Sequence, residues 1–229
     1  MKPSFYIFMG MCVCVFLTLG AWQVKRLAWK ESLLTEINKE LSIDAAQQQL
    51  TPDDMDLPQT YAVRRGYLKG SLDLSKSILW QGQISNGAPV DYIVAPFYFP
   101  RDQFIVPVVV GKCFEECNEI SARTRQNIKI IGTLKRHRDN MFRPKNNIAR
   151  NEWYRMDALD LSIQWNGHGR VRDVLFYAEN NDIDPYLAPV QSVLNVPNNH
   201  KQYAFFWFAM AGLILSLTIY QFLQSRRPQ

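Results

Sequence analysis

The sequence FYIFMGMCVCVFLTLGAW at residues 5–22 contains no charged side chain and decides how the chain is organised. At about 1.5 Å rise per residue, a helix of this length crosses a hydrocarbon layer of roughly 30 Å. A second charge-free run, YAFFWFAMAGLILSLTIYQFL, occupies residues 203–223. We therefore expect one transmembrane helix at each end, within residues 1–24 and 201–229, the latter segment ending in a short basic tail.

A cleaved signal peptide is the alternative interpretation of the first run. Such a peptide has a shorter apolar stretch and a small-residue cleavage site. Here Trp22, Gln23, Lys25 and Arg26 follow the apolar run, a pattern typical of an interfacial anchor. The pattern favours a retained helix. Positive charge does not fix the orientation of the two helices, because the positive-inside rule applies weakly to the long segment between them.

Residues 25–200 separate the two apolar runs and have room for one domain of ordinary size. Apolar side chains at three- and four-residue spacing predict an amphipathic helix that continues from the first span to about residue 48. Short β-branched and aromatic runs then predict strands, and a short helix is expected after Asp157. The expected fold class is an α+β membrane protein, in which two transmembrane helices flank one mainly antiparallel β extramembrane domain with marginal helices. The predicted strands occupy residues 61–68, 77–83, 90–99, 103–110, 128–134, 153–156 and 171–177.

The composition argues against several classes of function. The formal net charge is +5 and residues 129–145 are locally basic, but no nucleic-acid-binding motif accompanies them, so we expect no nucleic-acid partner. A phosphate-binding glycine loop, a paired-histidine metal helix and a Gly-x-Ser-x-Gly elbow are missing from the sequence. With His137, His168 and His200 as its only histidines, the sequence favours a protein that is not an enzyme.

Cys113 and Cys117 form the spacing C-F-E-E-C within the predicted domain. Three interpretations stay open: a local disulfide in an oxidising compartment, a pair of free thiols, and a Cu(I) site built from two thiolates. Cys12 and Cys14 lie inside the first apolar run, where such side chains are ordinary packing residues.

The start of the second apolar run is the candidate binding site. Asn198 or Asn199 is expected to cap a helix, after which His200, Tyr203, Ala204 and Trp207 follow at helical spacing. An imidazole at the membrane edge is suited to be an axial ligand to a haem iron, with the rings of Tyr203 and Trp207 beside the macrocycle. The alternative is an interfacial aromatic belt in which His200 simply meets water.

Small residues recur in both apolar runs, at Gly10, Cys14, Gly212 and Ser216. Such residues allow membrane helices to pack closely against each other or against a client protein. The alternative interpretation is that they simply face lipid.

Three motifs connect the chain with a known family. One ends the first apolar run, one lies in the polar segment before the predicted short helix, and one opens the second apolar run. Through them the chain resembles, over nearly its whole length, the surfeit locus protein 1 family of assembly factors for the haem-copper oxidase cytochrome c oxidase. The matching residues are Leu19, Gly20, Trp22, Gln23, Arg26 and Lys30; Phe142, Pro144, Asn146, Asn151, Trp153, Tyr154 and Asp157; and Pro197, Asn199, His200, Tyr203, Ala204, Trp207 and Phe208.

One segment departs from the family pattern. Family members commonly carry a strand similar to L-V-N-R-G-W-V-P, whereas this chain has VPVVVGKCFEEC at residues 106–117. Gly111 matches the glycine, but the Asn, Arg and Trp are absent. A partner contact carried by this strand is therefore expected to have diverged.

The resemblance implies a non-enzymatic role in maturing the largest subunit of cytochrome c oxidase, by binding or delivering haem A with His200 as a ligand to the iron. It also implies a central domain in the periplasm, or in the intermembrane space of mitochondria. The lack of an Arg- and Ser-rich presequence favours a bacterial inner membrane over the mitochondrial inner membrane. The expected partners are the largest oxidase subunit, membrane lipid and, as a further candidate, haem A synthase. Two alternatives stay open: a structural assembly clamp without a cofactor, and a membrane-anchored copper or thiol protein that uses Cys113 and Cys117.

Overall fold

The computed structural model describes residues 3–57, 62–85, 87–100, 104–113, 124–137, 142–166, 170–179, 183, 187–190 and 198–225. The chain divides into two compact units. One, which we call the helical pair, comprises residues 1–36 and 194–229, and the other, the β unit, comprises residues 37–193.

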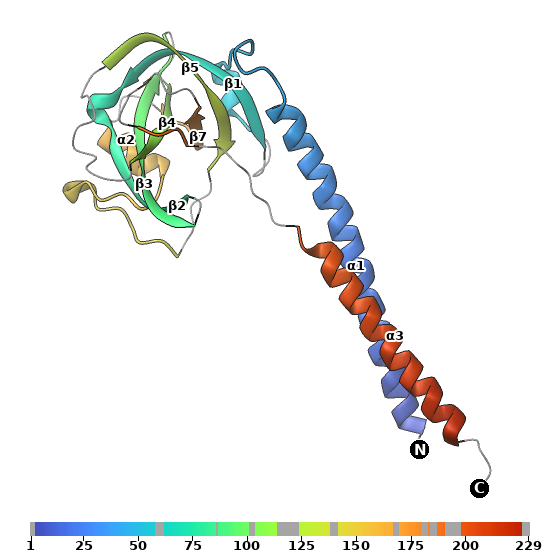
Figure 1. Ribbon diagram of the computed structural model, residues 1–229. Helices are drawn as coiled ribbons and strands as arrows, with labels where there is room; N and C mark the ends of the chain where they lie inside the picture. The colour runs from blue at the N-terminus through green and yellow to red at the C-terminus, as the bar shows by residue number, and fades with distance from the viewer. Residues whose placement is uncertain are drawn as a thin grey trace. The chain divides into compact units, whose positions relative to one another are not determined.

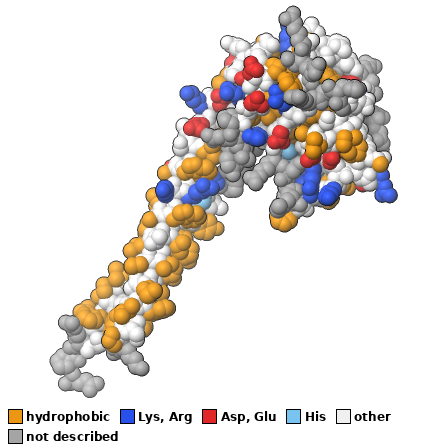
Figure 2. All heavy atoms as spheres, turned by 180° about the vertical axis from the view of Figure 1, so that it is seen from behind, with side chains coloured by type: hydrophobic (Ala, Val, Ile, Leu, Met, Phe, Trp, Pro, Cys, Tyr) orange, Lys and Arg blue, Asp and Glu red, His pale blue; other side chains and the backbone are white. Residues whose placement is uncertain are grey.

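The helical pair is built from α1 (Pro3–Leu41) and α3 (His200–Ser225). The two helices run antiparallel (Figure 1), since Tyr6 near the start of α1 contacts Phe222 near the end of α3, and Phe16 contacts Trp207 in the first turns of α3. The rings of Tyr6 and Phe222 lie 5.8 Å apart, and those of Phe16 and Trp207 stack at 5.5 Å. Both helices are long and apolar enough to cross a membrane. Hydrophobic side chains cover most of their outer surface (Figure 2), as expected of helices whose surroundings are apolar.

Helix α1 confirms that the amphipathic segment continues from the first apolar run without a break. Its predicted end near residue 48 is wrong, since the helix ends at Leu41. Asp44 competes with the helix there, because its carboxylate accepts hydrogen bonds from the backbone N–H of Ala46 and the side chain of Gln47.

The β unit contains seven strands among its described residues, together with short helices at its margins. Five of the strands close into a barrel, because β1 pairs with β3 and β5, β7 pairs with β5 and β4, and β4 pairs with β3. The strands are β1 (Val63–Asp73), β2 (Ile78–Ser85), β3 (Ala88–Tyr98), β4 (Phe104–Cys113), β5 (Thr124–Arg136), β6 (Arg170–Val171) and β7 (Val174–Ala178). The short helices are η1 (Pro52–Met55), η2 (Leu74–Lys76), η4 (Ile148–Arg150) and α2 (Ala158–Gln164).

The mainly antiparallel β domain expected from the sequence is confirmed, with one addition. Strand β4 pairs in parallel with β6 and β7, whereas the other pairings between strands are antiparallel. This parallel contact closes the barrel and removes exposed strand edges between its five members.

Two buried clusters fill the β unit. One draws alternate residues from all five barrel strands, including Leu68, Phe97 and Phe176. The other lies on the opposite face of several strands and contains Trp153 and the α2 residue Leu161. Strand β4 contributes to both clusters, so both of its faces are buried. This explains its nearly continuous apolar sequence, FIVPVVV, at residues 104–110.

The strand predicted at residues 153–156 is wrong. Trp153 forms only an isolated bridge to Trp80, and the following residues leave the sheet. Asn151, just before them, has a φ of 56°, in the left-handed region, which turns the chain. The short helix predicted after Asp157 is confirmed as α2, and the Asp157 carboxylate accepts hydrogen bonds from the N–H groups of Leu159 and Asp160.

Candidate functional site

The candidate site lies at the start of α3. The backbone carbonyl of Asn199 accepts hydrogen bonds from the N–H groups of Gln202 and Tyr203, at 3.1 and 3.2 Å. Asn199 is therefore the N-cap residue, and His200 is the first residue of the helix. The free amides of this first turn favour negative charge nearby.

His200 contacts α1 through Gln23. The imidazole Nδ1 of His200 and the side-chain oxygen Oε1 of Gln23 are 2.7 Å apart, a short hydrogen bond between residues 177 positions apart in the chain. Both side chains are half-buried. The sequence analysis treated Gln23 as part of an interfacial anchor and a family motif, and missed it as the partner of His200. The only local signal for this role was the position of Gln23, a side-chain amide directly after an apolar run.

The two aromatic residues predicted beside His200 lie in different surroundings. Trp207 is half-buried, and its ring stacks on that of Phe16 in α1 with an interplanar angle of 18°. Tyr203 is 53% exposed. The structure therefore brings Trp207 into the contact between the helices and leaves the ring of Tyr203 accessible from outside the pair.

The helices approach closely beside the His200 and Gln23 contact. A β carbon built on Gly20 would lie 2.7 Å from the ring of Phe208, so a larger residue at position 20 would require this ring to move. Ala204 and Ala211, on the same side of α3 as His200 and Trp207, are buried. By contrast, a β carbon added to Gly10 or Gly212 would have no atom within 4 Å, so these two glycines do not mediate the contact between the helices.

Positive charge surrounds the site along both helices. The basic residues lie within about two turns of Gln23 or His200, beyond the apolar parts of the helices. Figure 2 shows Lys and Arg side chains at one end of the helical pair, with hydrophobic side chains over the remainder. These basic residues are Lys25, Arg26 and Lys30 on α1 and Lys201 on α3.

These features fit a haem held by one axial ligand. A half-buried imidazole would provide the ligand, the exposed ring of Tyr203 would provide an apolar contact, and the basic residues with the α3 amides would provide partners for propionate groups. Within the residues that the structure describes, no group of three or more His, Cys, Asp and Glu side chains could hold a metal ion.

The second family motif lies in the β unit, where its residues form hydrogen bonds in the loop before α2. The side-chain oxygen of Asn146 accepts hydrogen bonds from the N–H groups of Tyr154 and Arg155, at 2.9 and 2.8 Å. Its amide nitrogen donates to the carbonyl of Arg155 and to a carboxylate oxygen of Asp160, at 3.0 and 2.8 Å. The indole of Trp153 donates to the side chain of Asn151 at 2.7 Å. These bonds hold the loop before α2 together, and Trp153 is buried in the same cluster as Leu161 of that helix.

The disulfide, the free thiols and the Cu(I) site considered for Cys113 and Cys117 all stay predictions. The backbone of Cys113 ends β4, but its side chain and the whole of Cys117 lie outside the described residues. Cys12 and Cys14 are free thiols in α1. The diverged strand is largely β4, whose residues 105–111 are buried in the barrel wall, so these side chains serve packing.

Comparisons with known proteins agree with the motifs. The model of the SURF1 family matches residues 10–212. The chain is 26% identical over 220 residues to a SURF1-like protein of Rickettsia felis, covering 90% of this chain and 92% of that protein. It is 27% identical over 218 residues to Surfeit locus protein 1 of Rattus norvegicus, covering 85% of this chain and 68% of that protein. It is 25% identical over 230 residues to the Homo sapiens protein of the same name, covering 90% of this chain and 73% of that protein. The resemblance inferred from the sequence is thus confirmed, and the chain belongs to the SURF1 family.

Proposed function

We propose that this protein is a membrane-anchored assembly factor for a haem-copper cytochrome c oxidase, which binds haem A and delivers it to the largest oxidase subunit. Membership of the SURF1 family supports the assembly role. The observation that carries the haem proposal is the half-buried imidazole of His200, at a helix start and in contact with Gln23.

The helical pair supports placement in a membrane. The exposed surfaces of α1 and α3 are apolar over lengths sufficient to cross a hydrocarbon layer. We place both helices in a bacterial inner membrane, with the β unit in the periplasm.

In this proposal His200 is a temporary ligand. A single imidazole bond leaves the iron open to exchange with a ligand set in the client subunit. The basic residues Lys25, Arg26 and Lys201 hold the propionates near the membrane surface, and Tyr203 contacts the macrocycle. These side chains retain and orient the haem without performing a chemical conversion.

The proposal is tested with full-length protein co-expressed with haem A synthesis and purified in detergent. Absorption spectra and extracted-haem analysis are compared for the original protein, His200→Ala and the matched control His137→Ala, whose ring contacts Trp80 in the β unit. We expect haem A in the original protein and the control, and its loss from His200→Ala. Equal haem A in all three would exclude His200 as the ligand.

Co-purification with the oxidase subunit tests the assembly role in the same preparations. Haem bound without any retention of the subunit would contradict delivery to this client. Retention of the subunit by a protein that never carries haem A would contradict haem binding and favour a structural clamp.

A further inference from the structure

The hydrogen bond between Gln23 and His200 joins two residues from different family motifs. Gln23 lies at the end of the apolar part of α1, and His200 begins α3. Their facing atoms are the amide oxygen Oε1 and the ring nitrogen Nδ1, at 2.7 Å. This direct contact gives Gln23 a route to affect the chemistry of the imidazole.

The packing of the helices fixes the position of Gln23. Phe16, Gly20 and Gln23 recur at four- and three-residue spacing, which places them on one face of α1. Phe16 stacks on Trp207, and the missing side chain of Gly20 admits the ring of Phe208. Gln23 therefore projects from a packed helix face, whose neighbouring contacts hold its backbone in place.

The contact determines which ring nitrogen carries the proton. An amide oxygen has no hydrogen to donate, so with Oε1 of Gln23 facing the ring, Nδ1 is the N–H donor of this hydrogen bond. In a neutral imidazole the remaining lone pair then lies on Nε2. Nε2 is consequently the atom available to coordinate iron. The hydrogen bond at Nδ1, on the opposite side of the ring, fixes the orientation of the imidazole. An acceptor on the second nitrogen of a ligating histidine also increases the basicity of the ligand.

We propose that Gln23 is a positioning residue for His200, which keeps the proton on Nδ1 of the imidazole and presents Nε2 to a haem iron. The part of the proposal that concerns haem rests on the function proposed above. The tautomer is a property of the protein alone and can be measured without haem.

The first experiment determines the tautomer of His200 in the full-length protein in detergent, with ¹⁵N-labelled histidine. The chain has only three histidines, so the His200 signals are assigned as those missing from His200→Ala. We expect the Nδ1–H form in the original protein, and a shift toward the Nε2–H form, usual for a free imidazole, in Gln23→Leu. An Nε2–H form in the original protein, or an unchanged spectrum in Gln23→Leu, would overturn the proposal.

The second experiment measures haem A affinity and reduction potential. Loss of a partner behind a ligating histidine weakens metal binding roughly 10–100-fold, and we expect this loss in Gln23→Leu. Gln23→Glu keeps an acceptor oxygen and adds negative charge, so it should restore affinity and lower the potential of the bound haem. The added charge lowers the potential through space in either case, so the recovery of affinity together with the Nδ1–H form in the ¹⁵N spectrum is the result that a purely structural role for Gln23 would not give. The matched control is Gln202→Leu, an exposed glutamine on α3, which should bind as the original protein does.

The outcomes separate the two proposals. If the original protein binds haem A and Gln23→Leu binds it equally well, with an unchanged potential, the positioning role is wrong while the carrier function stands. If the original protein binds no haem A, the carrier function is wrong, and the ¹⁵N spectra still decide whether Gln23 sets the tautomer of His200.

Discussion

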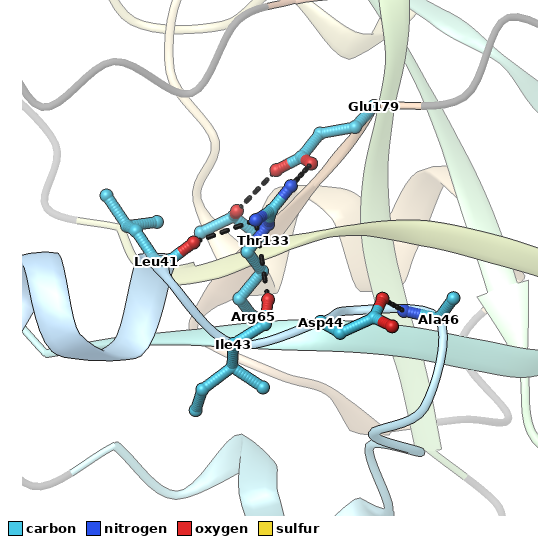
Figure 3. Close-up of polar contacts among 7 residues, drawn as sticks. All are labelled: Leu41, Ile43, Asp44, Ala46, Arg65, Thr133 and Glu179. Carbon is cyan, nitrogen blue, oxygen red and sulfur yellow. Dashed lines mark hydrogen bonds and ion pairs between the residues drawn. The ribbon is translucent and has the colours of Figure 1, made fainter.

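The guanidinium of Arg65 donates a hydrogen bond to the carboxylate of Glu179 at 2.9 Å. Its other terminal nitrogen donates to the carbonyl oxygen of Leu41, the last residue of α1, at 2.7 Å. Figure 3 shows these residues together with Thr133, whose hydroxyl donates to the second carboxylate oxygen at 2.7 Å. Arg65 therefore satisfies a carbonyl that a helix C-terminus leaves without an intrahelical partner. Within the β unit, it joins the end of α1 to the barrel.

Replacing Arg65 should destabilise the β unit. Arg65→Met leaves the carbonyl of Leu41 and the charge of Glu179 without this partner, and we expect a loss of about 2–3 kcal/mol in the free energy of unfolding. Urea denaturation of the full-length protein in detergent measures the change. The control is Arg64→Met, because Arg64 is more exposed and lies 3.8 Å from Asp54, in a contact that should contribute less than about 1 kcal/mol. Equal losses in the two variants would contradict the role assigned to Arg65.

Asn146 should be required for the fold of the loop before α2. Asn146→Ala removes four hydrogen bonds and leaves the N–H groups of Tyr154 and Arg155 without this acceptor, so we expect a loss of about 2–4 kcal/mol. The neighbouring variant Asn147→Ala is the matched control. Its side chain accepts one longer bond, at 3.3 Å from the N–H of Arg150, and should cost about 1 kcal/mol or less. Thermal unfolding compares them, and a larger loss for Asn147→Ala would contradict this prediction.

Lys135 should make stability depend on pH. Burial lowers the pKa of Lys135 to about 8, against an opposing effect of Glu179. An unfolded lysine keeps the ordinary pKa of 10.5, so between about pH 8 and about pH 10.5 the unfolded chain binds more protons than the folded chain. The free energy of unfolding should therefore increase with pH across this window.

The variant Lys135→Met tests this dependence. We expect it to abolish the increase and to stabilise the protein near pH 7 by up to about 3 kcal/mol, because the buried charge is removed. Denaturant unfolding at several pH values provides the measurement. Lys69→Met, at an exposed position of β1, should keep the increase. An increase that persists in Lys135→Met would show that another group causes it.

Gly20 should be critical for the helical pair. Gly20→Leu places a side chain where the ring of Phe208 lies, so we expect over-packing to cost about 1–3 kcal/mol in detergent-based unfolding of the protein. Gly10→Leu is the control, since no atom lies within 4 Å of its added β carbon. Adding Phe208→Ala to Gly20→Leu should recover part of the loss. If the second substitution brings no recovery, the contact between these residues is not the cause.

The sequence by itself determined the two apolar helices, most of the β strands and the family. These features are encoded locally, as charge-free runs, alternating residues and short motifs whose meaning does not depend on distant segments. The motif around Asn146 was also visible, but its physical role was not. The sequence at residues 153–156 had suggested a strand, but the N–H groups of Tyr154 and Arg155 donate to the side chain of Asn146 instead of to a neighbouring strand.

Only the tertiary structure decided how distant segments meet. The parallel pairing of β4 with β7 closes the barrel, and nothing in either strand specifies its neighbour. Likewise, Gln23 meets His200 across 177 residues because the packed faces of two helices set their register. The same packing directs Trp207 against Phe16 and leaves Tyr203 exposed, although both rings fit one helical pattern. Helical spacing places side chains on a face, but long-range packing decides what that face contacts.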